Sequence, residues 1–447
     1  MATQYMKNWW QAVAVYRDPR VAFLILFGFS SGLPLALTAS TLSTWLADVG
    51  VSLTAIGFFA AVATPYSLKF LWAPLVDRIR LPVLANLLGH RRSWMILIQT
   101  GLIFAIVGLG GSNPTDNPEV TAAFAVSVAF LSATQDIVID AYRVEILKRD
   151  QYAAGAATTV FGYRIAMLVS GAGALFLADR MAWEAVYLIM AAVQGVGILA
   201  VLLNPEPAPN GSETLAKEGA VADRLTGRRE RVLAWIYMAV IAPFHEFMTR
   251  SGVRTAFVIL AFVVFYKFGD ALAGTMTNPF LIKIGFTKSE IAEVVKLFGF
   301  VATLVGLALG GVVVKAMGLF RALLLCGVLQ LVSNLVFAVQ AQLGADLGFL
   351  AVTIGFENLA GGMGSAVFIA YISALCNLAF TATQYALLSS LAVVGRTMLS
   401  TGGGALAEAV GWVDFFLLTA VAAVPGLLIL FWLRRLGLGL LNEPTRQ

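Results

Sequence analysis

Long apolar runs alternate with short polar loops along the chain, and each run is long enough to cross a bilayer. About twenty predominantly apolar residues span the hydrocarbon core as a helix. The pattern predicts an all-α integral membrane protein with twelve transmembrane helices. Their expected bounds are 21–47, 53–76, 93–111, 123–149, 152–178 and 183–203, then 254–284, 289–317, 319–340, 347–375, 383–408 and 411–433.

A polar segment separates the first six runs from the last six. Residues 204–231 begin with three prolines and end with three arginines, which is typical of a linker. A partly apolar stretch at 232–249 contains a proline, a histidine and a glutamate, so we expect an interfacial helix there. The predicted organisation is a six-helix bundle at 1–203, a cytoplasmic linker with this helix at 204–252, and a second six-helix bundle at 253–447.

The two groups of runs resemble each other. The stretch MLVSGAGAL (167–175) matches MLSTGGGAL (398–406), with an arginine upstream in both. The next run opens on a tryptophan followed four residues later by an aromatic, Trp183 with Tyr187 and Trp412 with Phe416. These matches predict pseudo-symmetric halves. The alternative is that glycine-rich spans look alike because small residues let helices approach closely.

Composition excludes several classes of protein. Of the 447 residues, 59% are hydrophobic and 12% charged, and the mean hydropathy is +0.85, unlike a soluble domain. The cysteines, Cys326 and Cys376, lie in apolar runs, and the histidines, His90 and His245, are far apart, so no disulfide framework or metal site is predicted. We expect no cofactor and no enzyme activity.

Charge in the loops predicts the orientation. Lys and Arg gather in the N-terminal segment and at 77–92, 143–149, 204–231, 315–321 and 434–446. Basic loops face the cytoplasm, so twelve spans place both termini there. The isoelectric point near 9.2 therefore indicates membrane orientation and not nucleic-acid binding.

Two carboxylates lie in the second half of the fourth run. Asp136 and Asp140 are four residues apart, so they share one face of a helix, with Arg143 one turn further along. Charges inside a span are expensive and usually face a bundle interior or a watery cavity. One interpretation is that the carboxylates only brace Arg143 and the helix end. The other is that Gln135 and Asp136 line a polar path through the membrane.

Two six-span halves joined by a cytoplasmic linker resemble the major facilitator superfamily. The loop after the second span is similar to a signature of that superfamily: Asp77 and Arg78 are followed by GHRR (89–92). The resemblance implies that Asp77 and Arg78, with Arg143 beside them, latch the halves together on the cytoplasmic side. The alternative is that these are solvated charges that serve orientation only.

The polar segments inside the spans resemble the AmpG muropeptide permeases of bacterial inner membranes. The similar segments include GFSSGLPLALTASTL (28–42), SATQDIVIDAYRVEIL (132–147), YKFGDALAGTMTNPFLIKIGF (266–286) and FTATQYALLSSLAVVGR (380–396). The resemblance implies proton-driven import of N-acetylglucosaminyl-1,6-anhydro-N-acetylmuramyl peptides for peptidoglycan recycling, which feeds β-lactamase induction in some bacteria. This chain ends soon after its twelfth span, so functions tied to extra C-terminal helices are not expected.

Such a substrate is a sugar pair with a short charged peptide, and it needs a polar chamber. The candidate lining residues are Gly32, Tyr66, Lys69, Gln135, Asp136, Asp140, Tyr163, Arg164, Tyr266, Lys267, Asp270, Asn278, Glu357, Asn358, Gln384 and Arg396. Structural alternatives stay open for several of them. Lys267 and Asp270 could pair with each other, Glu357 and Asn358 could form a structural cap, and Gly32 could serve only close packing.

Proton coupling needs a desolvated carboxylate. Asp136 is the first choice, with Asp270 and Glu357 as alternatives, because the nearest cation on the same helix face is two turns away.

We expect a monomer whose partners are the substrate, protons and lipid, with no nucleic acid. Competing functions are a carrier of acyl-CoA or a nucleotide sugar, a membrane enzyme, and a receptor without transport. Dense arginine clusters would favour the first of these, and only Arg164 and Arg396 qualify.

Overall fold

The structure is a computed structural model that describes residues 12–52, 56, 59–208, 237 and 241–436. All regular elements in these residues are helices, which confirms the all-α prediction. Ten helical segments in the described part of the chain are long and apolar enough to cross a membrane. They are Pro19–Asp48, His90–Gly110, Pro118–Ile146, Arg149–Ala178, Trp183–Leu203, Val253–Lys283, Ser289–Met317, Leu319–Leu343, Leu347–Leu375 and Trp412–Arg435.

The first half of the chain forms one bundle. Its main helices are α2 (Pro19–Ala22), α3 (Leu24–Thr38), α4 (Ser40–Asp48), α9 (His90–Gly110), α10 (Pro118–Ile146), α11 (Tyr152–Leu168), α12 (Ala174–Ala178), α13 (Trp183–Gln194) and α14 (Val196–Leu203). A short helix, α8 (Leu84–Leu88), lies in the loop before α9. A π-helix, η5 (Val169–Gly173), joins α11 to α12.

The second half forms the other bundle. Its main helices are α18 (Val253–Phe265), α19 (Phe268–Lys283), α21 (Gly299–Met317), α22 (Leu319–Leu343), α23 (Leu347–Leu375) and α26 (Trp412–Arg435). The eighth span begins with α20 (Lys288–Ile291) and a π-helix, η7 (Ala292–Phe298). The helix α17 (Ala242–Arg250) precedes this half and covers the end of the predicted interfacial helix; most of 232–241 lies outside the described residues.

The second and eleventh spans are irregular. The second consists of short pieces, η2 (Ala60–Ala63), α6 (Thr64–Leu68), η3 (Lys69–Leu71) and α7 (Ala73–Arg78). Prolines at the first turns of α6 and α7 remove backbone donors and favour new helix starts. The eleventh span is divided into α24 (Thr381–Ser400) and α25 (Gly403–Val410).

The helix starts repeat between the halves at one constant spacing. His90, Pro118, Tyr152 and Trp183 begin α9, α10, α11 and α13, and Leu319, Leu347, Thr381 and Trp412 begin α22, α23, α24 and α26. The tryptophan match from the sequence is therefore in register. The glycine-rich match is two residues out of register, so Arg396 lies almost one turn further along its helix than Arg164 does.

The first span contains two glycines and a proline, and α3 runs through all three. The backbone departs from helix at Ala39, where φ is −117° and ψ is −99°. The glycines allow α3 to touch α11. A Cβ on Gly28 would lie 1.9 Å from the Thr159 carbonyl oxygen, and one on Gly32 would lie 2.3 Å from the Tyr163 carbonyl oxygen.

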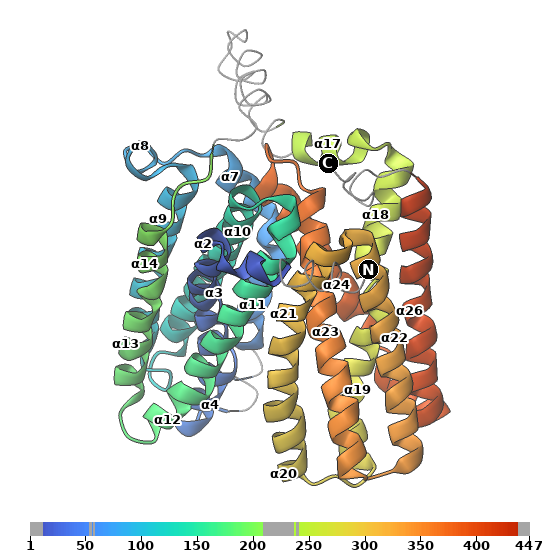
Figure 1. Cartoon of the computed structure of the whole chain (residues 1–447). Helices are drawn as coiled ribbons and strands as arrows, with labels where there is room; N and C mark the ends of the chain where they lie inside the picture. The colour runs from blue at the N-terminus through green and yellow to red at the C-terminus, as the bar shows by residue number, and fades with distance from the viewer. Residues whose placement is uncertain (1–11, 53–55, 57–58, 209–236, 238–240, 437–447) are drawn as a thin grey trace.

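Figure 1 shows the two bundles side by side, with α8 and α17 at one end and α20 at the other. The halves meet where α11 packs on α21 and α23, and where α7 and α10 pack on α24. We call the end with the loops 77–92, 143–149 and 315–321 the basic end. The residue bounds of the two predicted domains and linker stay a prediction.

Candidate functional site

Twelve of the sixteen predicted lining residues keep part of their surface exposed. They are Tyr66, Lys69, Asp136, Asp140, Tyr163, Arg164, Lys267, Asp270, Asn278, Glu357, Asn358 and Arg396. Four others, Gly32, Gln135, Tyr266 and Gln384, are buried. Exposed or half-buried charges inside apolar spans are the chemistry expected of a polar path between bundles.

The carboxylates of α10 form the centre of the charged group in the first half. Asp136 and Asp140 are half-buried, whereas the residues between them are buried. The Ser31 hydroxyl donates to Asp136 at 2.5 Å. The Asp140 carboxylate accepts from Arg143 at 3.1 Å and lies 3.9 Å from the Lys69 ammonium. Asp140 is therefore held between two cations.

The cation nearest to Asp136 comes from a neighbouring span and not from its own helix face. Lys69, on the irregular second span, is close enough for its charge to act on Asp136 as well as on Asp140. Asp136 nevertheless differs from Asp140, because a neutral hydroxyl and not a guanidinium donates to it.

A second charged group occupies the other half. The Lys267 ammonium lies 3.8 Å from Asp270 and donates to the Ser365 hydroxyl at 3.0 Å. This confirms the alternative that Lys267 and Asp270 pair with each other. Ser365 has the place in α23 that Asp136 has in α10. The place of a half-buried carboxylate in the first half is therefore taken in the second half by a serine that binds a lysine.

Glu357 and Asn358 bond to each other as the structural alternative proposed. The Asn358 amide donates to Glu357 at 2.9 Å and to the Ile354 carbonyl at 3.0 Å, and it accepts from the Thr303 hydroxyl at 2.8 Å. Both side chains are half-buried. Asn358 is therefore fixed in orientation and still reaches the space between the halves.

Two of the predicted residues, Gln135 and Gln384, are buried glutamines with hydrogen-bond partners in the protein. Gln135 is fully buried, and its oxygen accepts from Gln194 at 3.2 Å. Gln194 also bonds to Ser30 and Gln99 inside the first bundle. Gln384 accepts from the Asn377 backbone and donates to Glu246 near the basic end.

Tyr266 and Gly32 also serve packing. The Tyr266 hydroxyl donates to the Leu323 carbonyl at 2.8 Å, and its ring stacks on Phe368. Gly32 provides the contact of α3 with α11 described above. These four residues are buried in this structure, and their contact with substrate stays a prediction. Periodicity places a residue on a helix face, but it does not distinguish a face toward another helix from a face toward a cavity.

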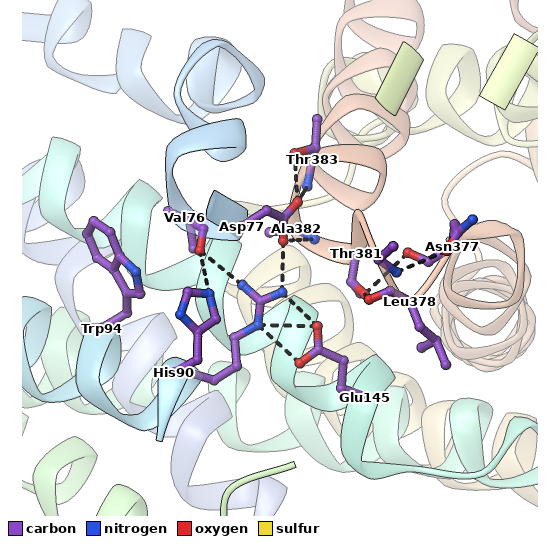
Figure 2. Close-up of polar contacts among 12 residues, drawn as sticks. Val76, Asp77, His90, Trp94, Glu145, Asn377, Leu378, Thr381, Ala382 and Thr383 are labelled. Carbon is purple, nitrogen blue, oxygen red and sulfur yellow. Dashed lines mark hydrogen bonds and ion pairs between the residues drawn. The ribbon is translucent and has the colours of Figure 1, made fainter. Parts of the chain in front are cut away.

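Asp77 joins the two halves at the basic end. Its carboxylate accepts from the backbone N–H of Ala382 at 3.1 Å, from the N–H of Thr383 at 2.8 Å and from the Thr383 hydroxyl at 2.7 Å (Figure 2). These donors belong to the first turn of α24, so Asp77 of the first half caps a helix of the second half. Arg91 holds the same carboxylate at 2.8 Å and pairs with Glu145 at 2.7 Å.

Other contacts cross between the halves near this end. Arg143 is 1% exposed and donates to Ser373 at 3.2 Å and to the Tyr385 hydroxyl at 2.8 Å. The Arg78 guanidinium lies over the Phe380 ring, 5.4 Å from its centre. An ion pair joins Lys315 to Asp150. All three predicted latch residues therefore contact the opposite half.

No role was predicted for Glu206, which binds the first turn of α9, the helix that carries Arg91. Its carboxylate accepts from the backbone N–H groups of Arg91 at 2.8 Å and Arg92 at 3.0 Å, so it caps α9. Burial raises the pKa of the Glu206 carboxyl, and the two amide donors oppose that rise. No local pattern links residue 206 to α9, because the contact spans most of the first bundle.

A pocket of about 280 Å³ opens at the seam between the halves. Its lining comes from α11 on one side and from η7, α21 and α23 on the other: Arg164, Val295, Lys296, Phe300, Thr303 and Asn358. Lys296 was not among the predicted residues, although a lysine inside an apolar span is itself a signal. In the part of the chain that the structure describes, no three His, Cys, Asp or Glu side chains come together to hold a metal ion.

Solved structures with a similar fold are transporters. The proton:xylose symporter XylE bound to 6-bromo-6-deoxy-D-glucose aligns with a TM-score of 0.62 over 97% of this chain and 96% of its own, at 14% identity. The human organic anion transporter MFSD10 aligns with a TM-score of 0.60 over 95% of this chain and 99% of its own, at 13% identity. These likenesses confirm the major facilitator fold.

Sequence relatives are more specific. A family model described as acetyl-coenzyme A transporter 1 matches residues 20–188. The anhydromuropeptide permease of Escherichia coli (strain K12) is 40% identical over 97% of this chain and 82% of its own length. The putative transporter AmpG 4 of Rickettsia felis is 35% identical over 94% of this chain and 98% of its own length. The chain therefore belongs to the AmpG family of anhydromuropeptide permeases, within the major facilitator superfamily.

Proposed function

We propose that the protein imports anhydromuropeptides, a sugar pair with or without a short peptide, across the bacterial inner membrane for peptidoglycan recycling. The observation that carries this proposal is the arrangement of half-buried charges of both signs on facing helices of two bundles. Lys69, Asp136 and Asp140 lie on one side, and Lys267 and Asp270 on the other. A zwitterionic peptide on a sugar needs such a mixed lining. The 40% identity to an anhydromuropeptide permease supports the same solute.

Transport proceeds by alternating access of the site to the two sides of the membrane. The contacts of Asp77, Arg78 and Arg143 latch the bundles at the basic end, which faces the cytoplasm by the distribution of loop charge. In this proposal, the latched arrangement is the state closed to the cytoplasm. Both termini are cytoplasmic, and the transporter works as a monomer, since each chain supplies both halves of the chamber.

Uptake of a radiolabelled anhydromuropeptide into right-side-out membrane vesicles tests the proposal directly. Vesicles with the protein should accumulate label above vesicles without it, and excess unlabelled anhydromuropeptide should abolish the difference. Equal uptake in the two preparations contradicts the proposal.

An acyl-CoA is the second candidate solute, because the acetyl-coenzyme A transporter model matches residues 20–188. Competition separates the two. Excess acetyl-CoA should leave anhydromuropeptide uptake unchanged if the sugar peptide is the solute, and labelled acetyl-CoA should not accumulate. Competition by acetyl-CoA at similar concentrations would favour this second candidate.

Proton coupling is part of the proposal, with Asp136 as the carrier. The Asp136 carboxylate is half-buried, and its hydrogen bond comes from the neutral Ser31 hydroxyl, whereas Asp140 is paired with both Lys69 and Arg143. Asp270 pairs with Lys267 and is the weaker alternative. Glu357 accepts from an amide and remains the other candidate.

Asp136→Asn should abolish accumulation driven by a pH gradient and leave exchange of labelled for unlabelled substrate within about threefold of wild type. Asparagine keeps the bond to Ser31 but cannot carry a proton. The matched control is Asp150→Asn at the exposed Lys315 pair, which should retain gradient-driven uptake. Protonophore-sensitive accumulation by Asp136→Asn would exclude Asp136 as the carrier.

A further inference from the structure

The pocket at the seam is built from both bundles. Arg164 on α11 enters it from the first half, and Lys296 on the π-helix η7 enters it from the second. A cation on each wall is unusual, because like charges that share a pocket repel each other. Both side chains are exposed, so each is reachable from the space between the halves.

Arg164 and Lys296 have no ion-pair partner among the residues that the structure describes. Within the described residues, no carboxylate lies within 4 Å of Arg164 or Lys296. The other cations of the chamber differ in this respect, since Lys69 pairs with Asp140 and Lys267 pairs with Asp270. The pocket therefore holds a net positive charge that an external anion can satisfy.

The backbone around Lys296 is also irregular. The π-helix Ala292–Phe298 lies in the eighth span, and the short pieces from Ala60 to Leu71 lie at the matching place in the second span. π-Helical turns occur frequently at functional sites, and interrupted helices at corresponding places of two repeats mark binding sites in transporters. Each irregular stretch brings one lysine toward the seam, Lys69 in the first half and Lys296 in the second.

The rest of the lining suits a carboxylate. The Asn358 amide is fixed by three hydrogen bonds and gives a polar wall, and Val295 and Phe300 give an apolar wall that lowers the local dielectric constant. At about 280 Å³ the pocket is at the lower limit of small-molecule sites. It can therefore hold one end of a sugar peptide and not the whole molecule.

We infer that Arg164 and Lys296 together bind a carboxylate group of the transported peptide, one cation from each half. The inference rests on the proposed function and specifies a subsite within it. The bound carboxylate offsets the repulsion between the two cations and draws α11 and η7 together. Substrate charge thereby favours closure of the seam over the loaded site.

The test compares uptake of two forms of one anhydromuropeptide, one with free peptide carboxylates and one with those carboxylates amidated. Wild-type protein should show about tenfold or more higher apparent affinity for the free form, the range expected for a charged hydrogen bond. Arg164→Gln and Lys296→Gln should each weaken affinity for the free form by about 10-fold to 100-fold and leave the amidated form within about twofold.

Matched variants separate binding from structure. Lys283→Gln removes an exposed cation at the end of α19 outside the pocket and should preserve the wild-type preference. Arg164→Lys should restore most of the preference, and Lys296→Glu should reverse it toward the amidated form. An equal loss for both forms, or no preference in the wild type, overturns the subsite. Absence of uptake of either form by wild-type protein instead contradicts the proposed function itself.

Discussion

Replacing Asp77 with asparagine should lower anhydromuropeptide uptake by about tenfold or more and open the basic end of the transporter. The carboxylate accepts four hydrogen bonds, one from Arg91 and three from the first turn of α24. Hydrogen bonds to a charged group contribute about 1.5–3 kcal/mol each. An asparagine has one acceptor oxygen and no charge, so it weakens the connection between the halves by several such bonds.

The measurement is the reactivity of a cysteine placed on the seam side of the basic end, at Ser373, toward a membrane-impermeant thiol reagent applied from the cytoplasmic side. In the latched protein Ser373 is 1% exposed, so labelling should be slow. It should accelerate in the Asp77→Asn background. Cys326 and Cys376 are both buried, but Cys376 lies three residues from Ser373, so both are replaced by alanine before labelling.

Lys315→Gln is the control for the latch. It removes an ion pair between the same two halves at the same end, but both partners are about one-third or more exposed. Exposed pairs contribute about 0–1 kcal/mol, so uptake and labelling should stay close to wild type. If Asp77→Asn behaves like Lys315→Gln, the latch does not depend on the buried carboxylate.

Replacing Gly28 with valine should prevent assembly of the first bundle. Even the Cβ of an alanine would lie 1.9 Å from the Thr159 carbonyl oxygen, so α3 and α11 would have to separate by more than about 1 Å. Gly32 and Gly162 make equally close backbone contacts at the same helix pair, and all of them would be lost together. We expect a loss of about 3 kcal/mol or more.

The yield of folded, monodisperse protein in detergent and its thermal unfolding midpoint measure this effect. The matched control is Gly274→Ala on α19, where an added Cβ meets nothing within 4 Å. That substitution should be neutral or stabilise by up to about 1 kcal/mol, because it reduces the entropy of the unfolded chain. Normal stability of Gly28→Val would contradict the close approach of α3 and α11.

The spans and the charged residues within them were predictable from the sequence. A run of apolar residues has a length that can be compared directly with the bilayer, and a charge inside it is conspicuous. Asp136, Asp140, Lys69, Lys267 and Asp270 were found in this way. The pairing of Lys267 with Asp270 was also foreseeable, because both belong to one turn of helix.

Contacts between helices could not be read from periodicity. Ser31 bonds to Asp136 and Glu206 caps α9, and each pair joins residues from different spans. Gln135 shows the same limit: it is buried in a network of amides within one bundle, whereas its neighbour Asp136 is half-buried and bonds to Ser31. Periodicity alone does not distinguish these two surroundings.

The cap that Asp77 places on α24 has a consequence for detecting the transport cycle. A helix leaves its first four N–H groups without intrahelical partners, and here those of Ala382 and Thr383 are satisfied only while the opposite bundle is in place. Separation of the bundles exposes both amides to solvent. The rate at which these two amides exchange with deuterium therefore reports, as an average over the transport cycle, to which side of the membrane the carrier is open. This measurement needs no engineered probe.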